Sequence, residues 1–255
     1  MPKPYKAAIS VIVPTLNEEK LITQFLSQFT PELKATFSIE LIISDGGSTD
    51  HTLEAVEPLL SESDKIVRHF KPVRQTIAEG RNRGADAASG EILVFFNADT
   101  LIECNGQSVL DFFTAVLETF KLYPNLHALI TPVRVFPDDE RPSDVAFHGF
   151  INWLYFCCIT LNIVGVGRGE CHIIRRKAFD AEQGYNERMA AGEDFDLFRR
   201  IGAARIKFLS RLCVYESPRR YRKYGYGAIF RAWGSNALWV VFRGKSHSQE
   251  WTEVR

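Results

Sequence analysis

The chain has 255 residues, of which 45% are hydrophobic, and its formal net charge is zero. This apolar content supplies a sizeable core and excludes an intrinsically disordered chain. Lysine plus arginine and aspartate plus glutamate both number 31, so composition provides no bulk attraction to nucleic acid. The five cysteines form no C-x-x-C pair, which argues against a disulfide framework or a zinc site. Because the N-terminus also lacks the apolar run of a signal peptide, we expect a cytoplasmic protein.

The first hundred residues alternate short apolar runs with helical patterns. Strands are predicted at residues 8–14, 39–44, 65–69 and 91–96. Helices are predicted at 18–29, where Asn17 suits the N-cap, and at 52–60 and 76–88. Continuous apolar strands separated by helices are typical of a mostly parallel sheet covered on both faces, so the predicted fold class is α/β.

The second half has a more varied pattern. Helices are predicted near 107–122, in a short segment closed by Gly184, and at 192–201. Strands are predicted at 126–136 and 171–175, with one or two more within 205–215. No repeat or linker interrupts the chain, so we expect a single domain over residues 1–255.

Two apolar segments raise the question of membrane contact. Residues 145–167 are long enough for a span, but His148, Asn152 and Asn162 dilute them and no flanking basic residues set an orientation. A buried or interface-lying helix is therefore favoured over a span. Residues 224–243 interleave aromatic side chains with arginine, which suits either a lipid interface or a helix packed on the domain.

Polar loops at the carboxyl ends of the predicted strands are the candidate binding site. Asp45 precedes Gly46 and Gly47, whose turn lets a ligand approach the backbone closely. A carboxylate beside such a turn accepts a hydrogen bond from a base or a ribose hydroxyl. The same residues also suit an ordinary loop in which Asp45 and Ser48 cap the next helix.

Two further acidic positions suggest metal binding and catalysis. Asp99 follows the buried strand at 91–96, where a carboxylate is costly unless it is exposed or meets a cation. It therefore suits Mg²⁺ or Mn²⁺, with phosphate oxygens completing the coordination, or else the N-cap of a helix starting near Glu103. Glu193 and Asp194 open the helix at 192–201, where carboxylates also favour the helix dipole.

The order of these elements resembles the family 2 glycosyltransferases of the GT-A fold, over about residues 10–200. The matching segments are Pro14 with Asn17-Glu18, Asp45 to Asp50, Arg81-Asn82-Arg83-Gly84, Asn97-Ala98-Asp99, Arg175 to Phe179, and Glu193-Asp194. Each segment is short and weak alone, but their order and spacing make the resemblance specific.

The resemblance implies a GT-A-type, Rossmann-like sheet with a nucleotide-binding half at 1–100 and an acceptor half at 101–255. It implies transfer of a sugar from a nucleotide-diphosphate donor, with a UDP-sugar favoured, to an acceptor hydroxyl, with inversion and assistance from Mg²⁺ or Mn²⁺. The acceptor is unknown: a glycan, a small molecule or a lipid-linked molecule. The C-terminal helix would then be a candidate contact with the cytoplasmic face of the membrane.

The resemblance also implies residue roles. Asp194 would be the catalytic base, with Glu193 beside it, and Asp99 the metal ligand. The nucleotide-sugar contacts would be Pro14, Thr15, Glu18, Asp45, Gly47, Arg81, Asn82, Asn97, Ala98, Arg219 and Arg220. For Arg219 and Arg220, phosphate contact competes with a solvated basic turn or a contact with anionic lipid.

Asn97 departs from the family pattern, because an acidic residue usually opens the D-x-D motif. Its amide still hydrogen-bonds a sugar, but the metal site loses one charge. A catalytically impaired nucleotide-sugar-binding relative is therefore one alternative. A nucleotidyltransferase is another, although the first loop lacks the glycine-rich phosphate-binding sequence of those enzymes.

Overall fold

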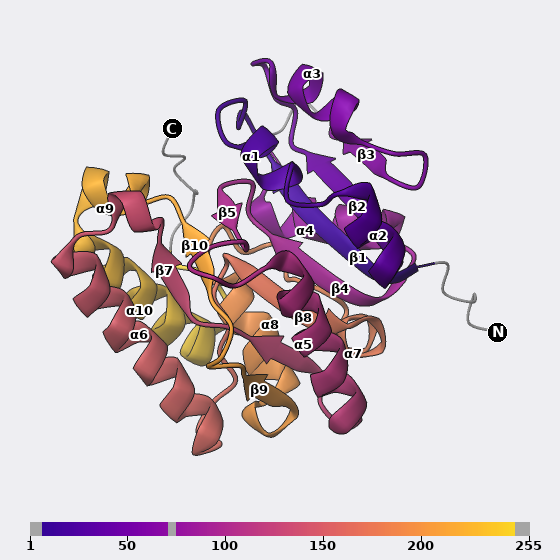
Figure 1. The fold of residues 1–255 in the computed structure, drawn as a ribbon. Helices are drawn as coiled ribbons and strands as arrows, with labels where there is room; N and C mark the ends of the chain where they lie inside the picture. The colour runs from indigo at the N-terminus through magenta and orange to yellow at the C-terminus, as the bar shows by residue number, and fades with distance from the viewer. Residues whose placement is uncertain (1–6, 71–74, 248–255) are drawn as a thin grey trace.

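The computed structural model describes residues 7–70 and 75–247, and a seven-stranded sheet lies at its centre (Figure 1). Its strand order is β3-β2-β1-β4-β8-β6-β9. The strands are β1 (Ala7–Thr15), β2 (Ile39–Asp45), β3 (Lys65–Arg68), β4 (Gly90–Phe96), β6 (Ala128–Ile130), β8 (Cys171–Arg175) and β9 (Ile206–Phe208). Strand β8 runs antiparallel to β4 and β6, and the other neighbouring pairs are parallel. The predicted mostly parallel sheet is confirmed.

Helices cover both faces of this sheet. One face packs against α1 (Ile22–Leu26), α2 (Pro31–Phe37), α3 (Thr52–Val56) and α5 (Val109–Leu122). The other packs against α4 (Ile77–Ala87), α7 (Arg176–Ala181) and α8 (Glu193–Ile201). Both faces of the central strands are therefore buried, which explains their continuous apolar sequences.

A second, three-stranded sheet has the order β5-β10-β7. Its strands are β5 (Thr100–Leu101), β7 (Val133–Val135) and β10 (Val214–Glu216). The prediction of one strand over 126–136 was wrong, because the chain leaves the large sheet after β6 and enters the small one at β7. Pro132 lies at this break, and proline lacks the N–H that a continuing ladder needs.

The predicted helix at 18–29 is much shorter, because α1 begins only at Ile22 and Asn17 does not cap it. Asn17 instead has a positive φ of 53°, and its side-chain oxygen accepts hydrogen bonds from the N–H groups of Thr49 (2.7 Å) and Asp50 (3.3 Å). The asparagine thus ties together the loops that follow β1 and β2. An amide that bonds a distant loop is unavailable to the nearer helix.

Three helices form one side of the molecule, at the left of Figure 1. They are α6 (Pro142–Thr160), α9 (Arg219–Tyr224) and α10 (Tyr226–Arg243). Helices α6 and α10 lie side by side, and the rings of Phe150 and Phe230 are 6.3 Å apart. Within residues 7–70 and 75–247, no helix combines the length and the apolarity needed to cross a bilayer. The short 3-10 segments are η1 (Glu57–Leu59), η2 (Pro137–Asp139) and η3 (Ala203–Arg205).

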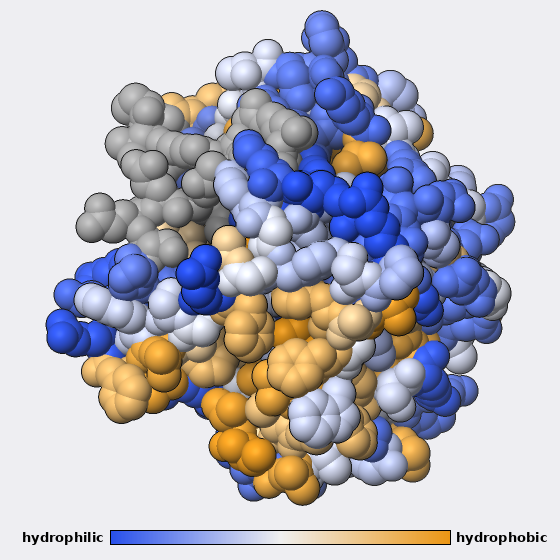
Figure 2. Space-filling view, turned by 90° about the vertical axis from the view of Figure 1, so that its left-hand side faces the viewer, coloured by the Kyte–Doolittle hydropathy of each residue, from blue (hydrophilic) through white to orange (hydrophobic). Residues whose placement is uncertain are grey.

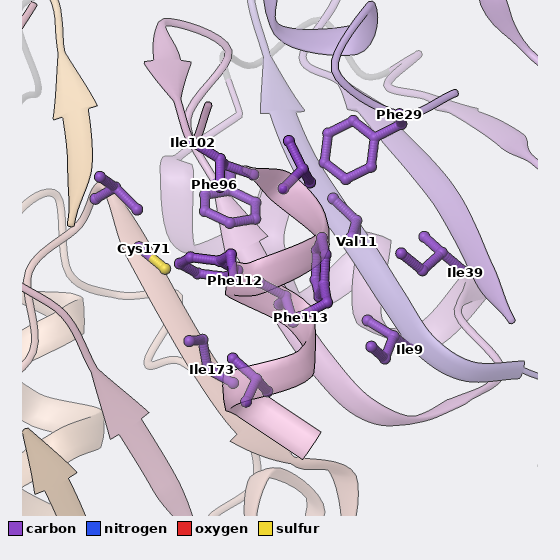
Figure 3. Packing of buried hydrophobic residues seen from close by; sticks show 14 of the residues in the cluster. Ile9, Val11, Phe29, Ile39, Phe96, Ile102, Phe112, Phe113, Cys171 and Ile173 are labelled. Atoms are coloured by element: carbon purple, nitrogen blue, oxygen red, sulfur yellow. The ribbon is translucent and has the colours of Figure 1, made fainter. Parts of the chain in front are cut away.

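Aromatic packing fixes α5 against the sheet (Figure 3). The ring of Phe112 lies 5.9 Å from that of Phe96 on β4. The ring of Phe113 lies 6.2 Å from Phe29 and 5.9 Å from Phe37. Phe112 and Phe113 are fully buried, so this helix holds β4, and the loop that follows it, in place.

We expect Phe113→Ala to lower the free energy of unfolding by about 3–5 kcal/mol, because it removes a buried ring and leaves a cavity. Leu110→Ala is the matched control on the same helix, since Leu110 is 50% exposed and its loss should cost at most about 0.5 kcal/mol. Urea unfolding monitored by circular dichroism measures both. Equal effects of the two substitutions would contradict the packing described.

Candidate functional site

The loops after β1 and β2 meet at the carboxyl edge of the sheet. Thr15 pairs with Asp45 in the parallel register, and the Gly46 N–H donates to the Thr15 carbonyl at 2.8 Å. The buried Asp45 carboxylate accepts from the N–H groups of Gly47 (3.0 Å) and Ser48 (3.2 Å). Gly47 has a φ of 94°, which favours glycine. Asp45 therefore stabilises its own loop, at the carboxyl edge of the sheet where the candidate site lies.

Glu18 belongs to the same edge. Its N–H donates to Thr52 Oγ1 at 2.8 Å, which fixes the loop that begins at Pro14 onto the start of α3. Its carboxylate accepts from Arg219 Nη2 of α9 at 2.6 Å. A residue from the first strand loop and one from near the C-terminus thus meet, although 201 positions separate them.

Asp99 meets the same arginine. Arg219 Nη2 lies 3.2 Å from Asp99 Oδ2, so one guanidinium bridges Asp99 and Glu18. Burial raises the pKa of Asp99, and Glu170 adds to this, whereas Arg219 opposes it; the pKa remains raised overall. A half-buried carboxylate with a raised pKa gains free energy from any cation that it binds.

The groups around Asp99 suit a metal ion that binds together with a phosphate-bearing substrate, rather than one held by protein ligands alone. Among the described residues there is no cluster of three or more His, Cys, Asp or Glu side chains suited to a metal ion. Mg²⁺ is commonly held by one or two carboxylates together with water and substrate phosphates. The Arg219 guanidinium is itself a cation against Asp99, which supports the attraction of this position for positive charge.

Arg81 lies at the centre of the site and is 1% exposed. Its Nη1 donates to Glu193 Oε1 at 2.6 Å, and its Nη2 donates to the Gly169 carbonyl at 2.7 Å and to Asn97 Oδ1 at 3.4 Å. The side chain therefore joins α4, α8, the loop after β4 and the loop before β8. Its contacts are with the protein itself, and a role of Arg81 in nucleotide binding remains a prediction.

Asp194 follows Glu193 in the first turn of α8. Burial and the neighbouring Glu193 raise the pKa of Asp194 to about 7, against the opposing charge of Arg81. A Cβ built on Gly169 would lie only 3.7 Å from Asp194 Oδ2 and 3.4 Å from Arg81 Nη2, so this glycine keeps the backbone close to both groups. A carboxylate with a pKa near 7 is suited to general-base catalysis.

The hydrogen bonds of Asn82 go to another segment of the chain. Its Nδ2 donates to the Tyr185 carbonyl at 2.9 Å and to Glu187 Oε1 at 3.0 Å, and its Oδ1 accepts from the Tyr185 N–H at 2.9 Å. Asn82 thus holds the loop after α7. Among the other predicted residues, Ala98 is buried beneath the turn and Arg220 is half-buried on α9.

Glu170 was not among the residues predicted from the sequence. Its carbonyl accepts from Thr100 Oγ1, next to Asp99, at 3.5 Å, and the preceding Gly169 carbonyl accepts from Arg81 Nη2 at 2.7 Å. Its charge contributes to the raised pKa of both Asp99 and Asp194. Burial raises the pKa of Glu170, but the Arg168 guanidinium lowers it by more, at an Nε–Oε2 distance of 3.3 Å. Arg168 Nη2 also lies 2.9 Å from Glu216 Oε1, and burial together with Glu170 raises the pKa of Glu216 well above its usual value. The surroundings therefore favour the charged form of Glu170 and the neutral form of Glu216.

Three alternating glycines before β8 are the sequence feature from which this loop could have been identified. A Cβ built on Gly165 would lie 1.9 Å from the Phe198 carbonyl oxygen, and one on Gly167 would lie 2.5 Å from the Phe198 ring. Only glycine allows so close an approach to α8. Gly165, Gly167 and Gly169 thus seat the loop that carries Arg168 and Glu170.

Residues 10–105 match the sequence model of glycosyl transferase family 2. An uncharacterized glycosyltransferase of Haemophilus influenzae is 33% identical over 95 residues, or 37% of each chain. A PGL/p-HBAD biosynthesis glycosyltransferase of Mycobacterium bovis is 27% identical over 198 residues, which are 73% of this chain and 66% of the relative. The alignments thus span less than two thirds of the length of both relatives.

Solved structures share the fold. The mannosyltransferase PcManGT of Pyrobaculum calidifontis, in complex with GDP-Man and Mn²⁺, matches with a TM-score of 0.67 at 22% identity, covering 93% of this chain and 66% of that one. Glucosyl-3-phosphoglycerate synthase of Mycobacterium tuberculosis, in complex with Mn²⁺, UDP-glucose and phosphoglyceric acid, matches with a TM-score of 0.59 at 20% identity, covering 91% and 79%. The match to the sequence model and to the named relatives shows a glycosyl transferase family 2 sequence over residues 10–105, and the common architecture shows a GT-A-type fold.

Proposed function

We propose that this protein transfers a sugar from a nucleotide-diphosphate donor to an acceptor hydroxyl with inversion at the sugar. The observation that carries the proposal is that Arg219 Nη2 lies 3.2 Å from Asp99 Oδ2, while the charge of Glu170 contributes to the raised pKa of both Asp99 and Asp194. One end of the site thus holds cationic groups suited to phosphates, and the other holds a carboxylate suited to a proton. Sugar transfer needs both, because a diphosphate leaves as the acceptor loses its proton.

The donor would bind along the loops after β1, β2 and β4. Asp45 and the backbone of Thr15 and Gly47 would contact the nucleoside, and Asn97 the sugar of the nucleotide. We propose a UDP-sugar as the donor; complexes of the structural neighbours with GDP-Man and with UDP-glucose make GDP the alternative to test.

The leaving diphosphate would lie between Asp99 and α9. Arg219 and Arg220 are its proposed guanidinium partners, because the planar guanidinium matches phosphate oxygens. Asp99 would hold Mg²⁺ or Mn²⁺ together with diphosphate oxygens, and the ion would supply Lewis-acid neutralisation of the leaving group. Arg219 then exchanges its contact with Asp99 for one with phosphate.

Asp194 would take the proton from the acceptor hydroxyl. Its raised pKa makes the carboxylate a stronger base than an ordinary aspartate while leaving it substantially ionised near pH 7. Glu193 is held by Arg81 at 2.6 Å, so it orients α8 and adds negative charge beside Asp194. Glu193 and Asp194 therefore have different proposed roles, because Glu193 pairs with Arg81 whereas Asp194 keeps a raised pKa.

We expect Asp99→Asn to abolish the gain in UDP affinity that Mn²⁺ confers on the parent protein, because the amide removes the charge that holds the ion. Isothermal titration with UDP, with and without Mn²⁺, measures this gain. Glu103→Gln is the control, since Glu103 is an exposed carboxylate four residues along the chain. If the metal dependence survives in Asp99→Asn, Asp99 is not the metal ligand.

We expect Asp194→Asn to lower transfer by about 10²–10⁴-fold while leaving UDP-sugar affinity close to that of the parent, because the amide keeps the shape but accepts no proton. UDP release with an acceptor found by screening measures transfer, and isothermal titration measures binding. The matched variant Glu193→Gln should instead weaken folding, since it leaves buried Arg81 without its carboxylate. Transfer within a few-fold of the parent would exclude Asp194 as the base and make Glu193 or Asp196 the candidate.

The pH dependence provides a second readout of the same substitution. Only the deprotonated carboxylate accepts a proton, so kcat/KM of the parent should rise with pH through about 7 and level off above it. A parent profile that is flat between pH 5 and pH 8 would contradict the assignment.

A further inference from the structure

Helices α6 and α10 and the loop after α6 expose large apolar side chains on one face of the molecule. Figure 2 shows this face, with apolar residues gathered over its lower half beneath a hydrophilic band. The exposed apolar residues are Val145, Phe150, Trp153, Phe156, Leu161, Ile163, Phe230, Leu238, Trp239, Val241 and Phe242. Monomeric soluble proteins rarely expose so many apolar side chains together, so we treat this α6/α10 face as an interaction surface.

The acidic side chain of α6, Asp144, and its histidine, His148, are both buried. Asp144 is buried and accepts from Arg222 Nη1 at 2.9 Å. His148 is buried, and burial with Arg168 nearby lowers its pKa to about 3, so it is neutral. No residue between 145 and 167 is a lysine, arginine, aspartate or glutamate. The helix thus offers no exposed charge that would oppose an apolar environment.

The segment of α9 and α10 is basic, whereas the loop before α6 carries the exposed Asp138 and Asp139. Residues 217–247 contain seven lysines and arginines and no acidic residue. Lys223, Arg231, Arg243 and Lys245 are exposed among them. Arg231 and Arg243 lie on α10 itself, each directly after an exposed phenylalanine. The charge of this segment therefore complements an anionic surface.

We propose that the α6/α10 face docks on an anionic lipid surface, with the two helices lying in the membrane interface. Tryptophan and phenylalanine favour the headgroup boundary, where Trp153, Trp239 and Phe242 would lie. Arginine and lysine side chains at the edge of a helix reach lipid phosphates while their methylenes cover apolar surface. Self-association is the less suitable use of this face, because a symmetric dimer would bring the basic α10 helices of two copies together.

The position of α9 connects this surface to the site. Helix α9 ends at Tyr224, two residues before α10 begins, and carries Arg219, which bridges Glu18 and Asp99. Tyr226 of α10 also hydrogen-bonds Arg222 of α9 at 2.9 Å. The membrane surface would therefore lie next to the helix that closes the proposed diphosphate site.

Vesicle sedimentation of the full chain tests the proposal without any sugar transfer, so it is independent of the proposed reaction. We expect the parent to sediment with vesicles of phosphatidylcholine and phosphatidylglycerol at 7:3, and far less with pure phosphatidylcholine, at low salt. The double variant Trp153→Ser, Leu238→Ser should lose at least tenfold in vesicle partitioning, because two exposed apolar anchors are removed. The variant Arg231→Gln, Arg243→Gln should lose about tenfold or more on the anionic vesicles only.

Leu122→Ser is the matched control, since Leu122 is 70% exposed but lies at the end of α5, outside the α6/α10 face. It should sediment like the parent, and all variants should keep the parent circular dichroism spectrum and UDP affinity. A parent that ignores anionic vesicles overturns the proposal. So does a parent dimer, detected by sedimentation velocity, that Trp153→Ser, Leu238→Ser dissociates while vesicle binding is absent, since the occupant is then a second copy.

Discussion

The organisation of the site depends on one buried cation. Arg81 has almost no contact with solvent, and removing such a charge from water costs several kcal/mol unless partners replace the lost hydration. Glu193, the Gly169 carbonyl and Asn97 provide those partners, and each comes from a different element. The arginine can therefore be buried only when α4, α8 and the two loops are in their observed places. Burial of Arg81 during folding therefore also brings the elements of the site together.

Charge is distributed around the site in alternating pairs. Arg81 offsets Glu193, Arg168 offsets Glu170, and Arg219 bridges Glu18 and Asp99. Asp194 has no ion pair comparable to these among the interactions described, and its raised pKa follows from burial beside Glu193. In the proposed reaction, the ion pairs of Arg81 and Arg168 would keep the site in place. Asp99 and Arg219 would exchange their mutual contact for contacts with the donor. Asp194 would take a proton from the acceptor.

In the second half of the chain, aromatic and polar contacts hold α6, α9 and α10 together. Tyr221 of α9 stacks on Tyr226 of α10, with ring centroids 5.6 Å apart, and its hydroxyl donates to Glu216 at 2.8 Å. Arg222 meanwhile reaches the buried Asp144 of α6. Asp144, Tyr221 and Arg222 are thus engaged in contacts among these helices and with Glu216, while large apolar side chains of α6 and α10 remain exposed beside Arg231 and Arg243. A surface with this polarity is expected of a protein that lies against an apolar phase.

The sequence by itself determined the α/β class, most strand and helix positions and the resemblance to family 2 glycosyltransferases, because apolar runs, capping residues and the motifs at Asp45 and Asp99 are local signals. Local signals also explain the predictions that were wrong. Asparagine is a common helix N-cap, but the side chain of Asn17 hydrogen-bonds the loop after β2 instead of capping α1. The tertiary structure alone decided that residues 126–136 divide between two sheets, that Arg81 bonds four segments of the protein together, and that the charge of Glu170 acts on both Asp99 and Asp194. It also joined the two apolar segments, predicted separately, into one exposed face. These outcomes depend on contacts between distant residues, such as Arg81 with Glu193 at 112 positions and Glu18 with Arg219 at 201 positions, and no local pattern specifies such contacts.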